Sequence, residues 1–133
     1  MISSSQRRLF DRMLEDILDE LPDQLHALLE EVPLIVEDEP GPALLREMEL
    51  DPRDTLLCGL HWGVALTDRS VEHTARMPDR MMLFREPIFR VAGYTPTPTG
   101  RERLEHQIHV TLLHEIGHHF GLDEDDLAAL GYG

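Results

Sequence analysis

The chain has 133 residues, of which 41% are hydrophobic and 29% charged, and it contains a single cysteine. This composition suits one globular domain over residues 1–133, so a two-domain organisation is not expected. The formal charge of -14 repels phosphate backbones and anionic lipids, so neither nucleic acid nor a membrane is an expected partner. The sequence has no lysine and no asparagine, which excludes Schiff-base chemistry and a Cys-His-Asn triad.

The first half of the chain is expected to contain mainly helices. After the serines at positions 3–5, apolar residues recur with helical spacing up to Leu21, and a second short helix is expected from Pro22 to about Val32. Residues 34–36 predict a strand that ends at an acidic turn, and residues 43–48 predict a short helix.

Residues 55–66 form an apolar stretch that predicts one bent strand or two strand segments. Its glycines at 59 and 63 are expected to mark a bulge or a close approach of another backbone. His61 is expected to be packed or hydrogen-bonded rather than a ligand. The leucines around Cys58 predict a buried thiol with a packing role, and a single cysteine without a disulfide partner fits a reducing compartment.

The second half of the chain is expected to begin with a strand over residues 81–84 and a brief helix from Pro87 to Val91. Residues 93–100 have the composition of a connector. A long helix is expected over residues 101–120, ended by Gly121, and a last short helix is expected to be capped by Asp123. The polar N-terminus has no signal-like apolar core, and no apolar run is long enough to span a bilayer. We therefore expect a cytoplasmic protein.

The long helix carries the sequence His114-Glu115-Ile116-Gly117-His118, an H-E-x-x-H motif. Histidines four residues apart differ by only about 40° around a helix, so His114 and His118 can bind one metal ion. Imidazole nitrogens suit Zn²⁺, and a catalytic zinc lowers the pKa of its water to about 7. Glu115, next to that face, would then be the general base. The alternative is a solvated or packed histidine face.

Gly121 and an acidic group follow the motif, in the H-E-x-x-H-x-x-G-x-x-ligand layout. This layout places Glu124 at the third ligand position, with Asp123 and Asp125 as alternatives. The acidic group can also serve as a helix cap, and the two roles are compatible. The histidines at 106, 109 and 119 are expected to lie at the surface or to contact the metal ligands, and not to bind the metal themselves.

The chain resembles the small bacterial zincin-like proteins called minimal metallopeptidases, which are related in motif to the Asp-zincins. The resemblance lies in HEIGHHFGL at residues 114–122, VEDEP at 36–40, GVALTDRSV at 63–71 and PDRMMLFREP at 78–87. It implies an α+β, zincin-like fold with N-terminal helices, a small mixed sheet and a central active-site helix. The family motif usually ends in aspartate, whereas this chain has Glu124 there.

The sequence therefore predicts a zinc metallopeptidase with one Zn²⁺ ion and a peptide or protein substrate. The competing interpretation is a zincin-like binding or regulatory module that keeps a metal but cleaves nothing. A metal-dependent RNase of similar size is disfavoured, because the net charge of -14 disfavours RNA.

Overall fold

The computed structural model describes residues 2–49, 57–62 and 80–129. Along the described chain the elements are α1 (Ser4–Glu20), α2 (Asp23–Leu29), β1 (Leu34–Glu37), α3 (Pro42–Glu47), β2 (Gly59–Trp62), β3 (Arg80–Phe84), α4 (Arg85–Ala92), α5 (Pro98–Phe120) and α6 (Glu124–Ala129). The expected α+β class is confirmed. Both ends of the strand predicted over residues 55–66 lie outside the described residues. The segment 63–71, which includes Gly63, and the side chain of His61 also lie outside them.

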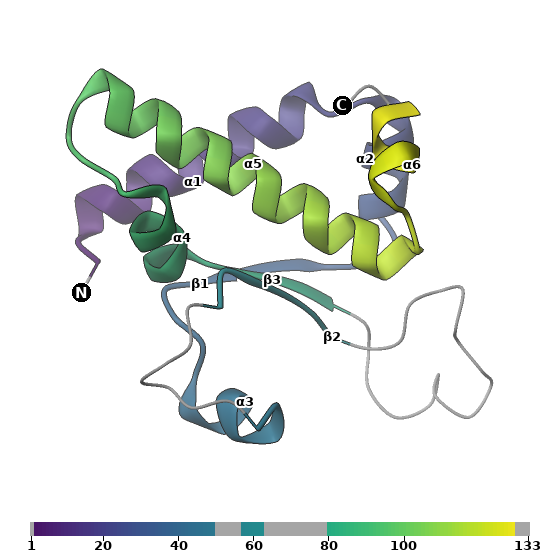
Figure 1. Ribbon diagram of the computed structural model, residues 1–133, viewed down its shortest axis with the longest axis horizontal. Helices are drawn as coiled ribbons and strands as arrows, with labels where there is room; N and C mark the ends of the chain where they lie inside the picture. The colour runs from purple at the N-terminus through teal and green to yellow at the C-terminus, as the bar shows by residue number, and fades with distance from the viewer. Residues whose placement is uncertain (1, 50–56, 63–79, 130–133) are drawn as a thin grey trace.

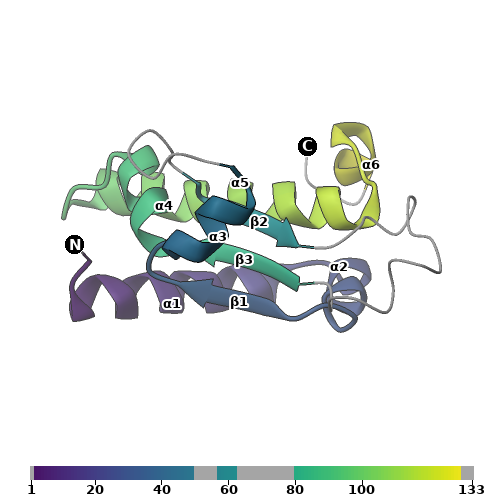
Figure 2. The same ribbon diagram turned by 90° about the horizontal axis from the view of Figure 1, so that it is seen from below.

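The sheet is small and mixed, as expected. β3 lies in the centre, parallel to β1 and antiparallel to β2 (Figure 2). In the register, Met82 of β3 stands between Ile35 of β1 and Leu60 of β2. Within the described part of the chain, β2 is therefore an edge strand of this sheet.

Helices α1 and α5 lie on one side of the sheet, and α3 lies on the other (Figure 1). The core fills the space between this pair of helices and the sheet, because both helices bury an apolar stripe. The largest fully buried side chains among the described residues are Phe10, Leu25, Met81, Leu83, Phe84, Ile88, Leu104, Ile108, Leu112, Ile116 and His119. None of the described helices combines the length and apolar character that a membrane span needs.

The helix starts follow from local hydrogen bonding. Ser3 caps α1 in a reciprocal capping box: its Oγ accepts from Gln6 N, and Gln6 Oε1 accepts from Ser3 N.

Two sequence expectations about helix starts need correction. α4 begins at Arg85 rather than Pro87, and α5 begins at Pro98 rather than residue 101. Both prolines lie in a first helical turn, where a backbone N–H has no acceptor within the helix, so proline, which lacks this group, breaks no hydrogen bond.

Asp38, at the turn after β1, joins three elements through ion pairs. Its carboxylate contacts Arg7 of α1 at 2.7 Å and Arg85 of α4 at 3.0 Å, and Arg85 also contacts Asp11 of α1 at 2.9 Å. The hydrogen bond from Arg7 is the largest effect on the pKa of Asp38 and lowers it, with a further contribution from Arg85. This cluster holds the first helix against the end of the sheet.

Asp38→Asn is expected to lower the thermal unfolding midpoint at pH 7 by about 3 °C, because partly exposed ion pairs stabilise only modestly. The pKa of Asp38 is lower in the folded state than its ordinary value of 3.8. The stabilisation is therefore present above that ordinary value and disappears as the pH falls through the lowered pKa. Thermal melts followed by circular dichroism should show the two midpoints converging in strong acid. A difference that stays constant down to strong acid would contradict this assignment.

Candidate metal centre

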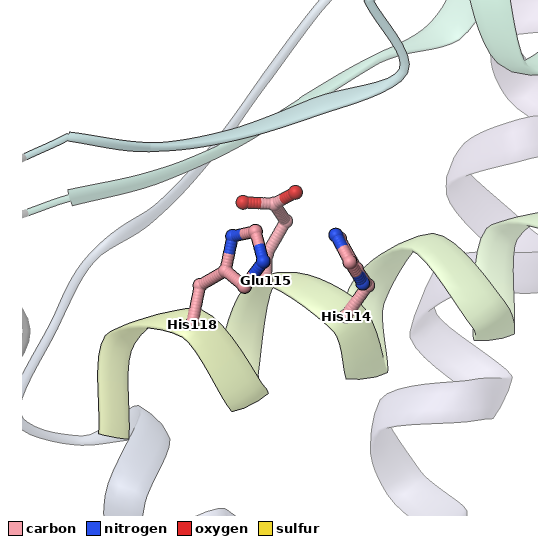
Figure 3. Close-up of side chains that lie close together, drawn as sticks. All are labelled: His114, Glu115 and His118. Carbon is pink, nitrogen blue, oxygen red and sulfur yellow. The ribbon is translucent and has the colours of Figure 1, made fainter. Parts of the chain in front are cut away.

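The H-E-x-x-H motif lies in the last turns of α5, where the helical spacing brings its two histidines together. The ring centroids of His114 and His118 are 4.1 Å apart, with an angle of 55° between the rings. Both histidines are exposed, and their side chains project from the same side of the helix as Glu115 (Figure 3). The face predicted from the four-residue spacing is therefore present.

Glu115 differs from the two histidines in being buried. The residue is only 5% exposed, and its carboxylate points from α5 toward the sheet (Figure 3). Its Oε2 atom has no hydrogen-bond partner among the described residues. One possible ligand atom from each of His114, Glu115 and His118 lies within 4.8 Å of the others. Two imidazoles at this separation suit a zinc ion, and the carboxylate beside them is placed either as a further ligand or as a base.

Burial changes the proton affinities at this site. It raises the pKa of Glu115 to about 7, because a charged carboxylate is poorly solvated there. Burial also lowers the pKa of His118, and the neighbouring His114 lowers it further. A lowered pKa favours the neutral imidazole, which is the form that binds metal ions. The neutral imidazole of His118 therefore fits a cation at this position.

The three side chains open onto a cleft of about 380 Å³ between α5 and the beginning of β2. The described residues that line it are Leu57, Cys58, Gly59, Gln107, Val110, Thr111, His114, Glu115 and His118. The sequence identified only the last three as site residues. Gln107, Val110 and Thr111 precede the motif residues by helical spacings on the same face, and this spacing could have revealed them.

The segment after the motif turns as the sequence predicts. Gly121 ends α5 with φ 66°, in the left-handed region, and Leu122 N donates to Gly117 O at 2.8 Å. Asp123 then caps α6: its Oδ1 accepts from Asp126 N at 2.8 Å, and Asp126 Oδ2 accepts from Asp123 N at 3.0 Å. Asp123 is thus confirmed as a cap. Glu124 is the first residue of α6, but its side chain lies outside the described part of the structure.

The expectation for Cys58 is wrong, and one of the two alternatives for His119 is excluded. Cys58 is half-buried and lines the cleft, rather than being enclosed in the core, because it lies just before the edge strand. Burial raises the pKa of its thiol, which agrees with the packing role expected for it. His119 is only 1% exposed and packs edge-on against Phe120, so it is not a surface residue. His106 is exposed, as expected.

A helix that carries two histidines and a glutamate on one face, set against a small mixed sheet, defines a zincin-like metallopeptidase architecture. A family model for zincin-like metallopeptidases matches residues 29–133, and the chain belongs to this family. This confirms the resemblance inferred from the sequence. No curated protein matches the chain.

Proposed function

We propose that the protein is a zinc-dependent peptidase whose reaction centre is the His114–Glu115–His118 face of α5. The observation that carries this proposal is the convergence of these three side chains within 4.8 Å at an open cleft. A buried carboxylate oxygen without a hydrogen-bond partner among the described residues costs free energy in the folded state. Groups of this kind, with a strongly shifted pKa and a place in a cleft, are typical of functional sites.

His114 and His118 would hold the ion through their imidazole nitrogens, and Glu124 would supply the third protein ligand. When bound, zinc supplies Lewis-acid chemistry: it lowers the pKa of water to about 7 and polarises a carbonyl group. The two histidines come from one rigid helix, so their relative positions are set before any ion binds. The third ligand would come from the chain that follows the turn at Gly121.

Glu115 would act as the general base. Its carboxylate takes the proton of the attacking water as the new C–O bond forms at the substrate carbonyl carbon. It then gives this proton to the amine nitrogen that leaves as the peptide C–N bond breaks. In the metal-free chain burial raises its pKa to about 7, so the group can accept and release a proton close to neutral pH.

The edge of β2 offers backbone groups for an extended peptide. Phe84 N donates to Cys58 O at 2.8 Å, so these two residues form a hydrogen-bonded pair of the antiparallel ladder. Such pairs alternate with pairs whose backbone groups point away from the partner strand. The N–H and C=O of Gly59 therefore point away from β3, beside the cleft. A peptide strand added at this edge would pair with them.

The test is a measurement of metal content combined with digestion of a mixed peptide library. We expect about one zinc per chain, cleavage products detectable by mass spectrometry, loss of cleavage after chelation and recovery when zinc is restored. Zinc binding without cleavage of any peptide would favour the alternative of a non-catalytic zincin-like binding module. Absence of zinc binding would contradict both functions.

The third ligand can be tested separately. Glu124→Ala is expected to weaken zinc binding by at least about tenfold, as for the loss of one of three protein ligands. Asp123→Ala should leave zinc affinity nearly unchanged but cost about 1 kcal/mol of stability, because Asp123 caps α6. Asp125→Ala should change neither zinc affinity nor stability. Adjacent residues of a helix point about 100° apart around its axis, so Asp125 would not face the ion if Glu124 does.

Isothermal titration with zinc, together with chemical denaturation of each variant, provides the comparison. A larger loss of zinc affinity in Asp125→Ala or Asp123→Ala than in Glu124→Ala would move the third ligand to that residue. The histidine pair would be unaffected by that outcome.

A further inference from the structure

Gly59, the first residue of β2, is a point where the edge strand closely approaches α5. A Cβ atom built at Gly59 would lie 2.9 Å from Thr111 Cγ2, 3.0 Å from Glu115 Cγ and 3.2 Å from the carbonyl oxygen of Met82. All three distances are shorter than ordinary van der Waals contacts. A bulge or a close backbone approach was expected here, and the structure shows a close approach to two side chains of α5 and to the backbone of β3. The two α5 side chains line the candidate metal centre.

The three neighbours differ in how easily they could move. The Met82 carbonyl belongs to the central strand of the sheet. Thr111 is β-branched and therefore stiff, and its Oγ1 accepts a hydrogen bond from Gln107 Nε2 at 3.1 Å, which holds its rotamer. Glu115 is the neighbour with the most freely rotating side chain. A methyl group at Gly59 would therefore displace the Glu115 side chain at Cγ, and the carboxylate beyond that atom would move with it.

We propose that Gly59 is a positioning residue for Glu115: its missing side chain provides the space in which the Glu115 carboxylate is held beside the two histidines. This inference rests on the proposed role of Glu115 as general base. Neither His114 nor His118 supplies one of the three atoms nearest to a Cβ at Gly59, so the ligand pair is not part of the effect. The missing side chain of Gly59 thus acts on the reaction through Glu115, separately from the backbone groups that Gly59 offers to a peptide.

The kinetic test uses Gly59→Ala in the zinc-loaded full chain. We expect kcat for peptide cleavage to fall by about ten- to a hundredfold, because small displacements of a reacting group have effects of this size. KM and zinc affinity should change by less than about threefold. Gly41→Ala is the matched control, since a Cβ at Gly41 would have no neighbour within 4 Å. Thr111→Ser in the Gly59→Ala background removes one clashing methyl group and should restore part of kcat.

A double-mutant cycle in metal-free protein provides a readout that does not depend on activity. Gly59→Ala is expected to lower the unfolding midpoint by about 5 °C in the wild-type background, as for an overpacked site. In the Glu115→Ala background part of this loss should disappear, because Glu115 Cγ, one of the three atoms that a Cβ at Gly59 would approach too closely, is gone. If Gly59→Ala alone does not fold, recovery of folding in the Glu115→Ala background is the equivalent result.

The two measurements separate the inference from the proposed function. Equal destabilisation in both backgrounds, failure of Glu115→Ala to recover folding, or an unchanged kcat in Gly59→Ala would overturn the positioning role. A protein that binds zinc and cleaves no peptide would instead contradict the proposed function, and the stability cycle would still decide whether Gly59 positions Glu115.

Discussion

Glu115→Gln is expected to lower peptide cleavage by about 10²- to 10⁴-fold while zinc stays bound, which is the range for loss of a general base. The amide has nearly the same shape as the carboxylate but cannot accept a proton from water at neutral pH. Because the residue is 5% exposed and lies against β2, a change that keeps its size should preserve the fold. Zinc titration and steady-state kinetics on the same preparation give both quantities.

The same experiment distinguishes a base from a ligand. Glu115 lies close enough to His114 and His118 to coordinate a metal itself. If Glu115 were a ligand, Glu115→Gln would weaken zinc binding as strongly as loss of a histidine. Glu102→Gln is the matched control, an exposed glutamate on the same helix and outside the cleft. Full activity in Glu115→Gln would remove the general-base assignment.

His114→Ala and His118→Ala are each expected to lower zinc affinity by at least about tenfold and to reduce peptide cleavage to the level of the metal-free protein. The reason is geometric. The two rings lie 4.1 Å apart on one helix face, so each supplies its own ligand atom, and the remaining histidine cannot supply the missing one. His106→Ala, an exposed histidine earlier on the same helix, is the matched control and should bind zinc normally. Isothermal titration measures all three variants.

If both histidine variants bind zinc with unchanged stoichiometry and affinity, the metal is held elsewhere and this face of α5 is not the centre. If only one variant is impaired, the pair is not the ligand set, and the affected histidine acts with other residues. Either result would contradict a metal centre built on His114 and His118.

The sequence predicted the elements whose signals are local. The apolar spacing up to Leu21 predicted α1, and the H-E-x-x-H spacing predicted the shared face of His114 and His118. Gly121 and Asp123 end one helix and cap the next as expected, because left-handed backbone and N-cap hydrogen bonds depend on nearby residues only. These features need no information from distant parts of the chain.

What the sequence left open depends on contacts between distant segments. Cys58 lies beside the cleft, and not in the core, because β2 is the edge strand next to α5, and strand order is not visible in a local pattern. His119 is adjacent to His118 in sequence, yet it faces the core, since neighbours on a helix diverge by about 100°. The burial of Glu115, which raises its pKa, likewise requires the sheet to be in place.

The helix starts that differ from expectation have a different cause. Proline commonly opens a helix, which predicts a start at Pro87, whereas the connector-like composition of residues 93–100 predicts a start at residue 101. In the structure the chain passes directly from β3 into α4, and Thr97 caps α5 ahead of Pro98. A strand that runs straight into a helix leaves no turn signal in the sequence.

A crystal structure of the zinc-loaded protein tests the proposed metal centre most directly. We expect one zinc ion bound by imidazole nitrogens of His114 and His118, with the Glu115 carboxylate next to the ion but not coordinated to it. Zinc–nitrogen distances of about 2.0–2.1 Å would establish the histidine ligands. A zinc ion bound away from the His114–His118 face, or coordinated by Glu115 as a full ligand with no place left for water, would contradict this centre.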